Sequence, residues 1–231
     1  MEQSSEVGQR LIVVPGEKIE LNGRKAGNGI YRHAGVYYSS RLGIVASRGG
    51  WLEVIPLSGK YLPIPGDEIV ATVVDMGPSN WLLDMNSPYP GVLHVSETPW
   101  KIEYGATAKY LDIGDNVTAR VVSVDESNHV QVTMRDRDLR KLRGGSTVDV
   151  PASKVPRVIG KGGSMIDMLK RLSGCKIIVG KNGRIWMEGE VDRMILLSEA
   201  IRIIDEQAQR HGLTDSVRNL LENAGTRRGN Q

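Results

Sequence analysis

The spacing of apolar positions changes along the chain from strand-like to helix-like. Between residues 11 and 55, short β-branched and aromatic runs alternate with glycine-rich turns, and a second series of such runs follows between residues 69 and 134. Runs of this kind are typical of strands, whereas from residue 164 onward apolar residues recur at helical spacing. The pattern therefore predicts a multidomain chain, with two all-β segments followed by one that mixes helices and strands.

The first segment predicts an all-β N-terminal domain over residues 1–62. Pro15-Gly16, Asn28-Gly29 and Gly49-Gly50 separate its apolar runs, and such pairs favour tight turns. Its sequence shows no grouping of catalytic side chains, so we interpret it as a packing or docking domain. The expected strands are Leu11–Val14, Ile30–His33, Val36–Ser39, Gly43–Ala46 and Trp51–Ile55.

The second segment, residues 63–140, predicts a five-stranded OB-fold β-barrel. Gly66-Asp67 and Gly114-Asp115 precede strands at similar distances, and residues 125–128 predict a tight turn. This scaffold often binds single-stranded nucleic acid on one face. The expected strands are Ile69–Val74, Trp81–Asp84, Gly91–Val95, Asn116–Val124 and Val130–Met134.

The third segment, residues 147–223, predicts an α+β domain around a glycine-rich loop. Val148 and Val150 predict a short strand, and Pro156 to Ile159 lead into the loop, residues 160–163. The other expected elements are a helix from Ser164 to about Gly174, a hairpin of Lys176–Val179 and Arg184–Met187 with an Asn-Gly turn, a long helix closed by Gly212, and a last short helix capped by Thr214. Residues 224–231 are expected to form a flexible tail.

Charge is distributed unevenly, although the formal net charge is only +3. Residues 61–134 carry a net charge of −7, whereas residues 154–184 carry +7, and residues 135–143 are also basic. Phosphate binding depends on local positive potential and counterion release, so the two basic stretches are the candidate surface for a nucleic acid. The alternative interpretation is an ordinary solvated surface.

Composition excludes several classes of protein. Hydrophobic residues make up 40% of the chain, which is typical of folded proteins, and no apolar run approaches the length of a membrane span. The single cysteine excludes an internal disulfide and a cysteine-rich zinc site. We therefore expect no membrane association, no cofactor, no bound metal and a cytoplasmic location.

The element order around Val158-Ile159-Gly160-Lys161-Gly162-Gly163-Ser164-Met165-Ile166 resembles the eukaryotic-type KH domain. Glycines let the backbone approach a sugar-phosphate chain closely, and amides at the start of the following helix face its phosphates. The RNA-binding residues expected here are Gly160, Lys161, Gly162 and Gly163, with Lys154 and Arg157 just upstream.

The second segment resembles the S-one RNA-binding domain through residues 91–97, Gly-Val-Leu-His-Val-Ser-Glu, and the Val-x-Met-Arg of residues 132–135. In that family aromatic residues on the second strand stack on bases, but here Ser79 and Leu82 take those places, and Trp81 is one position out of register. Trp81 and His94 each remain open between a structural place and an RNA contact. Further RNA-binding candidates at the exit of the barrel are Arg135, Arg137, Arg140, Lys141 and Arg143.

The three segments together resemble the KH-containing RNA-binding cap subunits of the archaeal exosome. The resemblance implies a non-catalytic subunit, present in three copies, that caps a hexameric ring of phosphorolytic ribonuclease subunits. It further implies that the N-terminal domain docks on the ring, and that the subunit guides single-stranded RNA toward 3′-to-5′ degradation.

Other functions remain to be weighed. A free-standing RNA-binding adaptor, or a translation or transcription factor with S-one and KH domains, is the alternative. A ribonuclease would need grouped carboxylates or an acid and base, whereas the acidic residues here are scattered. Polynucleotide phosphorylase places KH before S-one and adds two catalytic domains, for which this chain has no room. Transcription elongation factors carry paired KH domains of bacterial topology, whereas this chain has one glycine loop. The other exosome cap subunit needs zinc-binding cysteines, which the single cysteine excludes.

Overall fold

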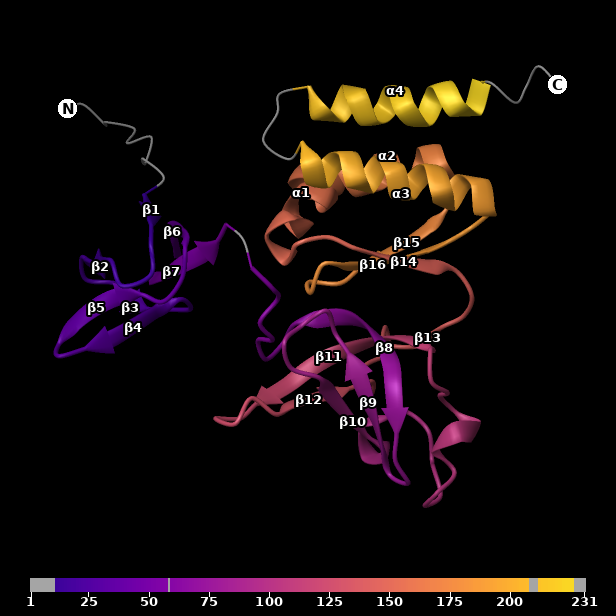
Figure 1. Cartoon of the computed structure of the whole chain (residues 1–231), viewed down its shortest axis with the longest axis horizontal. Coiled ribbons are helices and arrows are strands. Elements are labelled where there is room, and N and C mark those ends of the chain that lie inside the picture. Colours follow the sequence, from indigo (N-terminus) through magenta and orange to yellow (C-terminus); the bar gives the residue numbers. More distant parts are fainter. Residues whose placement is uncertain (1–10, 58, 208–211, 227–231) are drawn as a thin grey trace. The chain divides into compact units, whose positions relative to one another are not determined.

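The computed structural model describes residues 11–57, 59–207 and 212–226 (Figure 1). The chain divides into two compact units, residues 1–59 and residues 60–231. The division falls close to the boundary predicted after residue 62, and the barrel and the KH domain share the second unit. In the described ranges, no helix is long and apolar enough to cross a membrane.

The first unit is built from two small β-sheets around a modest core. One sheet has the order β1-β6-β7-β3, and the other β2-β5-β4. The strands are β1 (Ile12–Val13), β2 (Lys18–Ile19), β3 (Lys25–Ala26), β4 (Ile30–His33), β5 (Val36–Ser39), β6 (Gly43–Arg48) and β7 (Trp51–Pro56). The all-β prediction is confirmed, and the pattern missed only β2 and β3, whose two residues are too few to show a period. Val13, Ile19, Leu52 and Val54 form the core.

A closed β-barrel begins the second unit, as the sequence predicts. Its strands are β8 (Glu68–Met76), β9 (Asn80–Asp84), β10 (Gly91–His94), β11 (Asn116–Val124) and β12 (Val130–Thr133). They pair in the order β12-β10-β9-β8-β11, and a β11–β12 pairing closes the barrel. A short strand, β13 (Lys141–Leu142), pairs antiparallel with the start of β11. Two short 3-10 helices, η1 (Val95–Glu97) and η2 (Thr107–Lys109), lie in the connections between strands.

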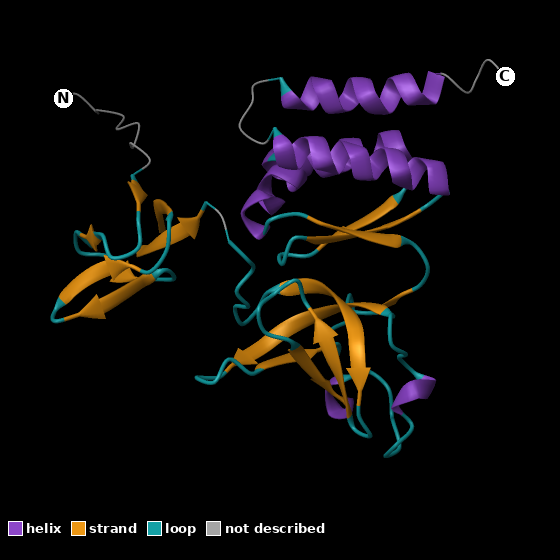
Figure 2. Ribbon diagram, viewed as in Figure 1, coloured by secondary structure: helices purple, strands orange, loops and turns teal. Residues whose placement is uncertain are grey.

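The KH domain follows with a three-stranded antiparallel sheet in the order β14-β16-β15. Its elements are β14 (Ser146–Asp149), η3 (Ala152–Lys154), α1 (Val155–Ile159), η4 (Lys161–Gly163), α2 (Ser164–Ser173), β15 (Lys176–Val179), β16 (Arg184–Glu188), α3 (Val191–Glu206) and α4 (Leu213–Thr226). The longer helices gather on one face of the sheet, and the barrel lies on its other side (Figure 2).

The C-terminal helix corrects one prediction. Residues 224–226 were expected in a flexible tail, but α4 continues to Thr226, while residues 227–231 lie outside the described residues. The helix persists because Leu213, Val217 and Leu221 recur every four residues and are all buried in the KH core. Packing of such an apolar face stabilises a helix more than local propensity does.

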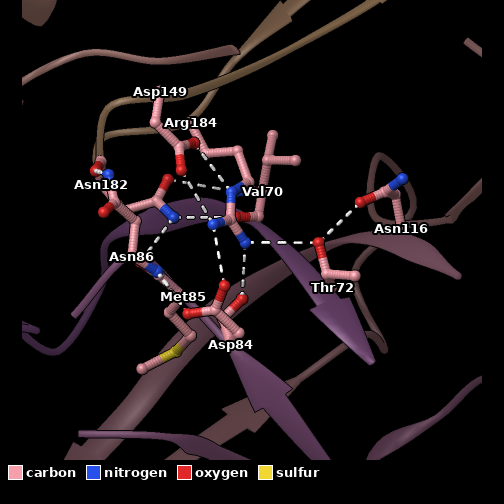
Figure 3. A network of polar contacts seen from close by, with 9 residues as sticks. All are labelled: Val70, Thr72, Asp84, Met85, Asn86, Asn116, Asp149, Asn182 and Arg184. Atoms are coloured by element: carbon pink, nitrogen blue, oxygen red, sulfur yellow. Dashed lines mark hydrogen bonds and ion pairs between the residues drawn. The ribbon is translucent and has the colours of Figure 1, made fainter. Parts of the chain in front are cut away.

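A polar network joins the barrel to the KH sheet (Figure 3). Arg184 of β16 is 7% exposed, and its guanidinium donates to Asp149 of β14 and, in the barrel, to Asp84 and Thr72. These contacts satisfy a buried charge, which isolated burial would penalise strongly.

The hairpin turn of the KH sheet places the side-chain amide of Asn182 in the same junction. Asn182 is fully buried, and its Nδ2 donates to the carbonyls of Val70 and Met85 at 2.7 and 2.8 Å. Its Oδ1 accepts from the Val70 amide at 3.3 Å. An apolar cluster of Val70, Leu142, Ile178 and Trp186 packs beside it. Polar pairing and apolar burial together make barrel and KH domain one unit.

Candidate nucleic-acid interface

The loop between α1 and α2 is held open by three glycines with left-handed backbone angles. Gly160, Gly162 and Gly163 have φ of 77°, 58° and 85°. Residues with a Cβ rarely adopt such angles, whereas glycine does so without steric cost. The chain therefore reverses between the two helices within four residues.

The glycines of this loop differ in what surrounds them. A Cβ on Gly160 would lie 2.7 Å from the amide nitrogen of Met165, so this position has no room for a side chain. A Cβ on Gly162 would meet nothing within 4 Å, and Gly162 is exposed. Gly160 is thus required by packing, whereas the space around Gly162 is open to an incoming backbone.

The start of α2 offers further groups to an anion. No side chain caps this helix end in the described structure, where Gly163 occupies the N-cap position. Amides of a first helical turn that lack a capping side chain favour phosphate. Asp167 adds one negative charge to the same turn, so the attraction depends also on the basic side chains nearby.

The basic stretch of residues 154–184 contains eight cationic side chains. Four of its side chains form ion pairs: Lys154 with Asp205, Lys176 with Glu188, Lys181 with Asp67, and Arg184 with Asp84 and Asp149. In the part of the chain that the structure describes, the exposed side chains of Lys161, Lys170 and Arg171 form no ion pair, and Arg157 is exposed on α1. We call these four residues, 157, 161, 170 and 171, the KH basic surface.

Lys154 already has an intramolecular partner. Its ammonium group lies 2.6 Å from the Asp205 carboxylate and donates to the Asp205 carbonyl, which ties the start of α1 to the end of α3. A charge neutralised in this way contributes little potential to an RNA cleft. We therefore leave Lys154 out of the KH basic surface.

Trp81 belongs to the barrel core, which removes it from the RNA-binding candidates. Its side chain is 0% exposed, and its indole N–H donates to the Leu111 carbonyl at 3.1 Å. A ring without exposed faces cannot stack on a base. Alternation along β9 explains why Trp81 is buried: Trp81 and Leu83 point into the barrel core, whereas Leu82, between them, is only half-buried.

His94 is exposed at the end of β10, where it caps η1. The Ser96 amide donates to its Nδ1 at 3.2 Å, and the Ser96 hydroxyl lies 2.7 Å from the same nitrogen. His94 therefore has a structural role as a helix cap. An RNA contact through the other atoms of its ring stays a prediction.

The three arginines that follow the last barrel strand in sequence have exposed side chains: Arg135, Arg137 and Arg140. Arg140 is fixed by its backbone, because its amide donates to the Thr118 hydroxyl and its carbonyl accepts from the Thr118 amide. It borders a cleft of about 260 Å³ that also includes Ile178 and Val179 of β15. The fold thus brings this arginine beside the KH sheet.

Comparison with known proteins bears directly on this arrangement. Residues 145–203 match the KH domain family, and this range contains the glycine loop and the KH basic surface. The exosome complex component Rrp4 of Methanosarcina mazei is 46% identical over 93% of this chain and 82% of its own length. The chain belongs to the Rrp4 family. Rrp4 of Thermoplasma volcanium is 42% identical over 96% of this chain and 94% of its own length.

A solved structure supports the same family. It is provisionally described as an exosome complex RNA-binding protein and is 34% identical to this chain, with a TM-score of 0.67. The match covers 74% of this chain and 99% of that structure's chain. The exosome subunit family predicted from the sequence is therefore confirmed.

One functional feature of this Rrp4-family chain escaped the sequence interpretation. Arg184 and Lys181 count toward the basic stretch, yet both are committed to the barrel junction through Asp84 and Asp67. Their partners lie about a hundred residues upstream in sequence, so no local pattern reveals them. Lys181 and Arg184 are therefore left out of the KH basic surface.

Proposed function

We propose that this chain is a non-catalytic RNA-binding subunit of an exosome, which captures single-stranded RNA and passes it to a ring of ribonuclease subunits. The observation that carries the proposal is the open loop at Gly162, flanked by the KH basic surface. A KH loop of this kind clamps about four nucleotides through their backbone. The names of the relatives, exosome complex component Rrp4, supply the assembly.

The first unit offers a surface suited to docking on that ring. Ile12, Ile44 and Ile55 lie opposite one another across β1, β6 and β7. Val14, Leu42 and Leu57 follow two residues along, on the same face, because side chains alternate along strands. Ile44 is half-buried and the other five are exposed. We call these six residues the apolar face.

An apolar face of this kind favours a protein partner over RNA. Contiguous exposed apolar rows on a small domain mark interaction surfaces, and they carry no charge to attract phosphate. We propose that the apolar face contacts the hexameric ring, with three copies per complex, while the KH basic surface stays available to RNA.

Two measurements test the proposal. Purification from a native lysate, followed by mass spectrometry, should recover ribonuclease ring subunits with this chain. The isolated chain should bind labelled single-stranded RNA and leave its length unchanged in the presence of phosphate and magnesium. Shortening that follows the protein through purification and mutation would contradict a non-catalytic role. Recovery without any ring subunit would favour a free-standing adaptor.

Point variants separate docking from RNA binding better than truncation does. Removing the KH domain would expose Val70 and Leu142 and would leave Asp84 without Arg184, so the barrel would be damaged too. We expect Ile12→Ser/Ile55→Ser to abolish co-elution with ring subunits while RNA affinity is unchanged. The control is Val191→Ser/Ile195→Ser on α3, which alters two aliphatic side chains that are more exposed than Ile12 and Ile55.

A further inference from the structure

A hollow of about 540 Å³ lies on the barrel, away from the glycine loop in sequence. Its walls come from Trp100, from the end of η2, from the turn before β11, and from β13 with the two residues that follow it. The residues that matter are Trp100, Lys109, Tyr110, Asp115, Lys141 and Arg143. The β11–β13 pairing and the contacts of Lys141 with Tyr110 and Asp115 bring these segments together, although about thirty residues separate them in sequence.

Positive charge dominates the hollow. Three cations line it against a single carboxylate, Asp115. Lys141 is already committed, since its ammonium pairs with Asp115 and contacts the Tyr110 carbonyl. Lys109 and Arg143 are exposed, and within the described ranges they form no ion pair. The two cations that remain available face the same space.

An aromatic pair stands beside these cations. The rings of Trp100 and Tyr110 are 5.5 Å apart at an interplanar angle of 32°, and both are half-buried. The Tyr110 hydroxyl donates to the Lys101 carbonyl at 3.0 Å, which fixes the ring. Proteins that bind single-stranded nucleic acid combine cations, which contact the phosphates, with aromatic rings, which stack on the π face of any base.

We propose that this hollow is a second contact site for single-stranded RNA, distinct from the KH loop. Lys109 and Arg143 bind backbone phosphates, and the Trp100–Tyr110 pair supports a neighbouring base. An acidic protein segment would use the cations but not the rings, so RNA fits the full set of side chains better. The inference rests on the proposed function, and it extends the RNA footprint beyond the four or so nucleotides of the KH loop.

The test compares two RNA lengths on the full chain. Lys109→Ala/Arg143→Ala should raise the Kd for a single strand of about 30 nucleotides roughly tenfold. The dependence of affinity on salt should flatten by about 0.7 per phosphate contact removed. A strand of about five nucleotides, which the KH loop can occupy alone, should bind as before. Arg202→Ala/Arg218→Ala on α3 and α4 is the control of equal charge.

A second variant works in the opposite direction. Asp115→Asn removes the only carboxylate of the hollow while keeping an oxygen that can accept from the Asp112 amide, as Asp115 does at 2.6 Å. It also releases the Lys141 charge, so affinity for the longer RNA should rise several-fold. Unchanged unfolding midpoints confirm that each variant folds.

Each outcome decides the matter. Unchanged affinity of Lys109→Ala/Arg143→Ala for the longer RNA overturns the inference, and so does an equal loss for both lengths. The proposed function survives either result if a KH loop variant still weakens binding. Loss of binding to a poly-glutamate peptide, with RNA binding intact, assigns the hollow to an acidic protein instead. Absence of RNA binding by the unaltered chain overturns both proposals.

Discussion

Arg184 Nη2 lies 2.8 Å from Asp84 Oδ2, which joins the central strand of the KH sheet to strand β9 of the barrel (Figure 3). Burial disfavours the charged guanidinium, but hydrogen bonds to Asp149 and Asp84 outweigh it, and the pKa of Arg184 is raised above its usual value. The pair therefore acts as a charged clamp between the barrel and the KH domain, in addition to the Asn182 hydrogen bonds and the apolar cluster at the same junction.

Removal of this clamp should destabilise the second unit. In Arg184→Met the two carboxylates lose their shared cation, and we expect the free energy of unfolding to fall by about 2 kcal/mol, less than for a fully buried pair because both carboxylates are partly exposed. Urea denaturation followed by tryptophan fluorescence measures the effect. Lys176→Met, which breaks the exposed pair with Glu188, should cost less than about 0.5 kcal/mol. Equal effects would contradict the clamp.

Asn182 supports the same junction by hydrogen bonds alone. Asn182→Ala leaves the Val70 and Met85 carbonyls unpaired in a buried place, and we expect a loss of about 3 kcal/mol in unfolding free energy. Thermal unfolding checks this, with Asn219→Ala on the exposed face of α4 as the control. A change within the error of the control would mean that the junction tolerates the loss, for instance by admitting water.

The glycine loop should respond in RNA affinity and not in folding. Lys161→Asp/Gly162→Asp places two carboxylates beside the phosphate path, and aspartate tolerates the left-handed angle of Gly162 better than most residues. We expect affinity for single-stranded RNA to fall at least tenfold and the salt dependence to flatten. Fluorescence anisotropy at several salt concentrations measures both.

The control for the loop variant is Thr214→Asp/Arg218→Asp, which makes the same change in charge on helix α4 and leaves the loop residues unaltered. It should reduce affinity only slightly. If both variants weaken RNA binding equally, net charge explains the effect and the loop is merely a turn.

Trp81 should matter for stability and not for RNA. Trp81→Phe removes the hydrogen bond to Leu111 and leaves a gap in the barrel core, so we expect a loss of about 1 to 2 kcal/mol in unfolding free energy. RNA affinity, measured below the unfolding transition, should equal that of the unaltered chain. Reduced affinity in a folded variant would restore the stacking role.

Local pattern determined most of the architecture of this protein. Alternating apolar residues predicted the strands of both β segments, and helical spacing from Ser164 predicted α2, because burial of one face imposes a period that is visible in sequence. The tight turn predicted at residues 125–128 joins β11 to β12, which pair as a hairpin. The parallel pairing of β10 with β12 has no local signal, because these strands lie far apart along the chain.

Tertiary structure alone decided which surfaces are available. The chain contains two tetrapeptides of the form Gly-Lys-x-Gly, residues 160–163 and 180–183. At the fourth position, a Cβ on Gly183 would lie 2.0 Å from the Val150 carbonyl oxygen, whereas one on Gly163 would come no closer than 3.5 Å to any neighbouring atom. The first loop is open and the second is buried against the barrel, because Asn182 finds hydrogen-bond partners about a hundred residues away. A sequence pattern specifies local backbone conformation, but exposure and ion pairing depend on contacts that only the folded chain brings together.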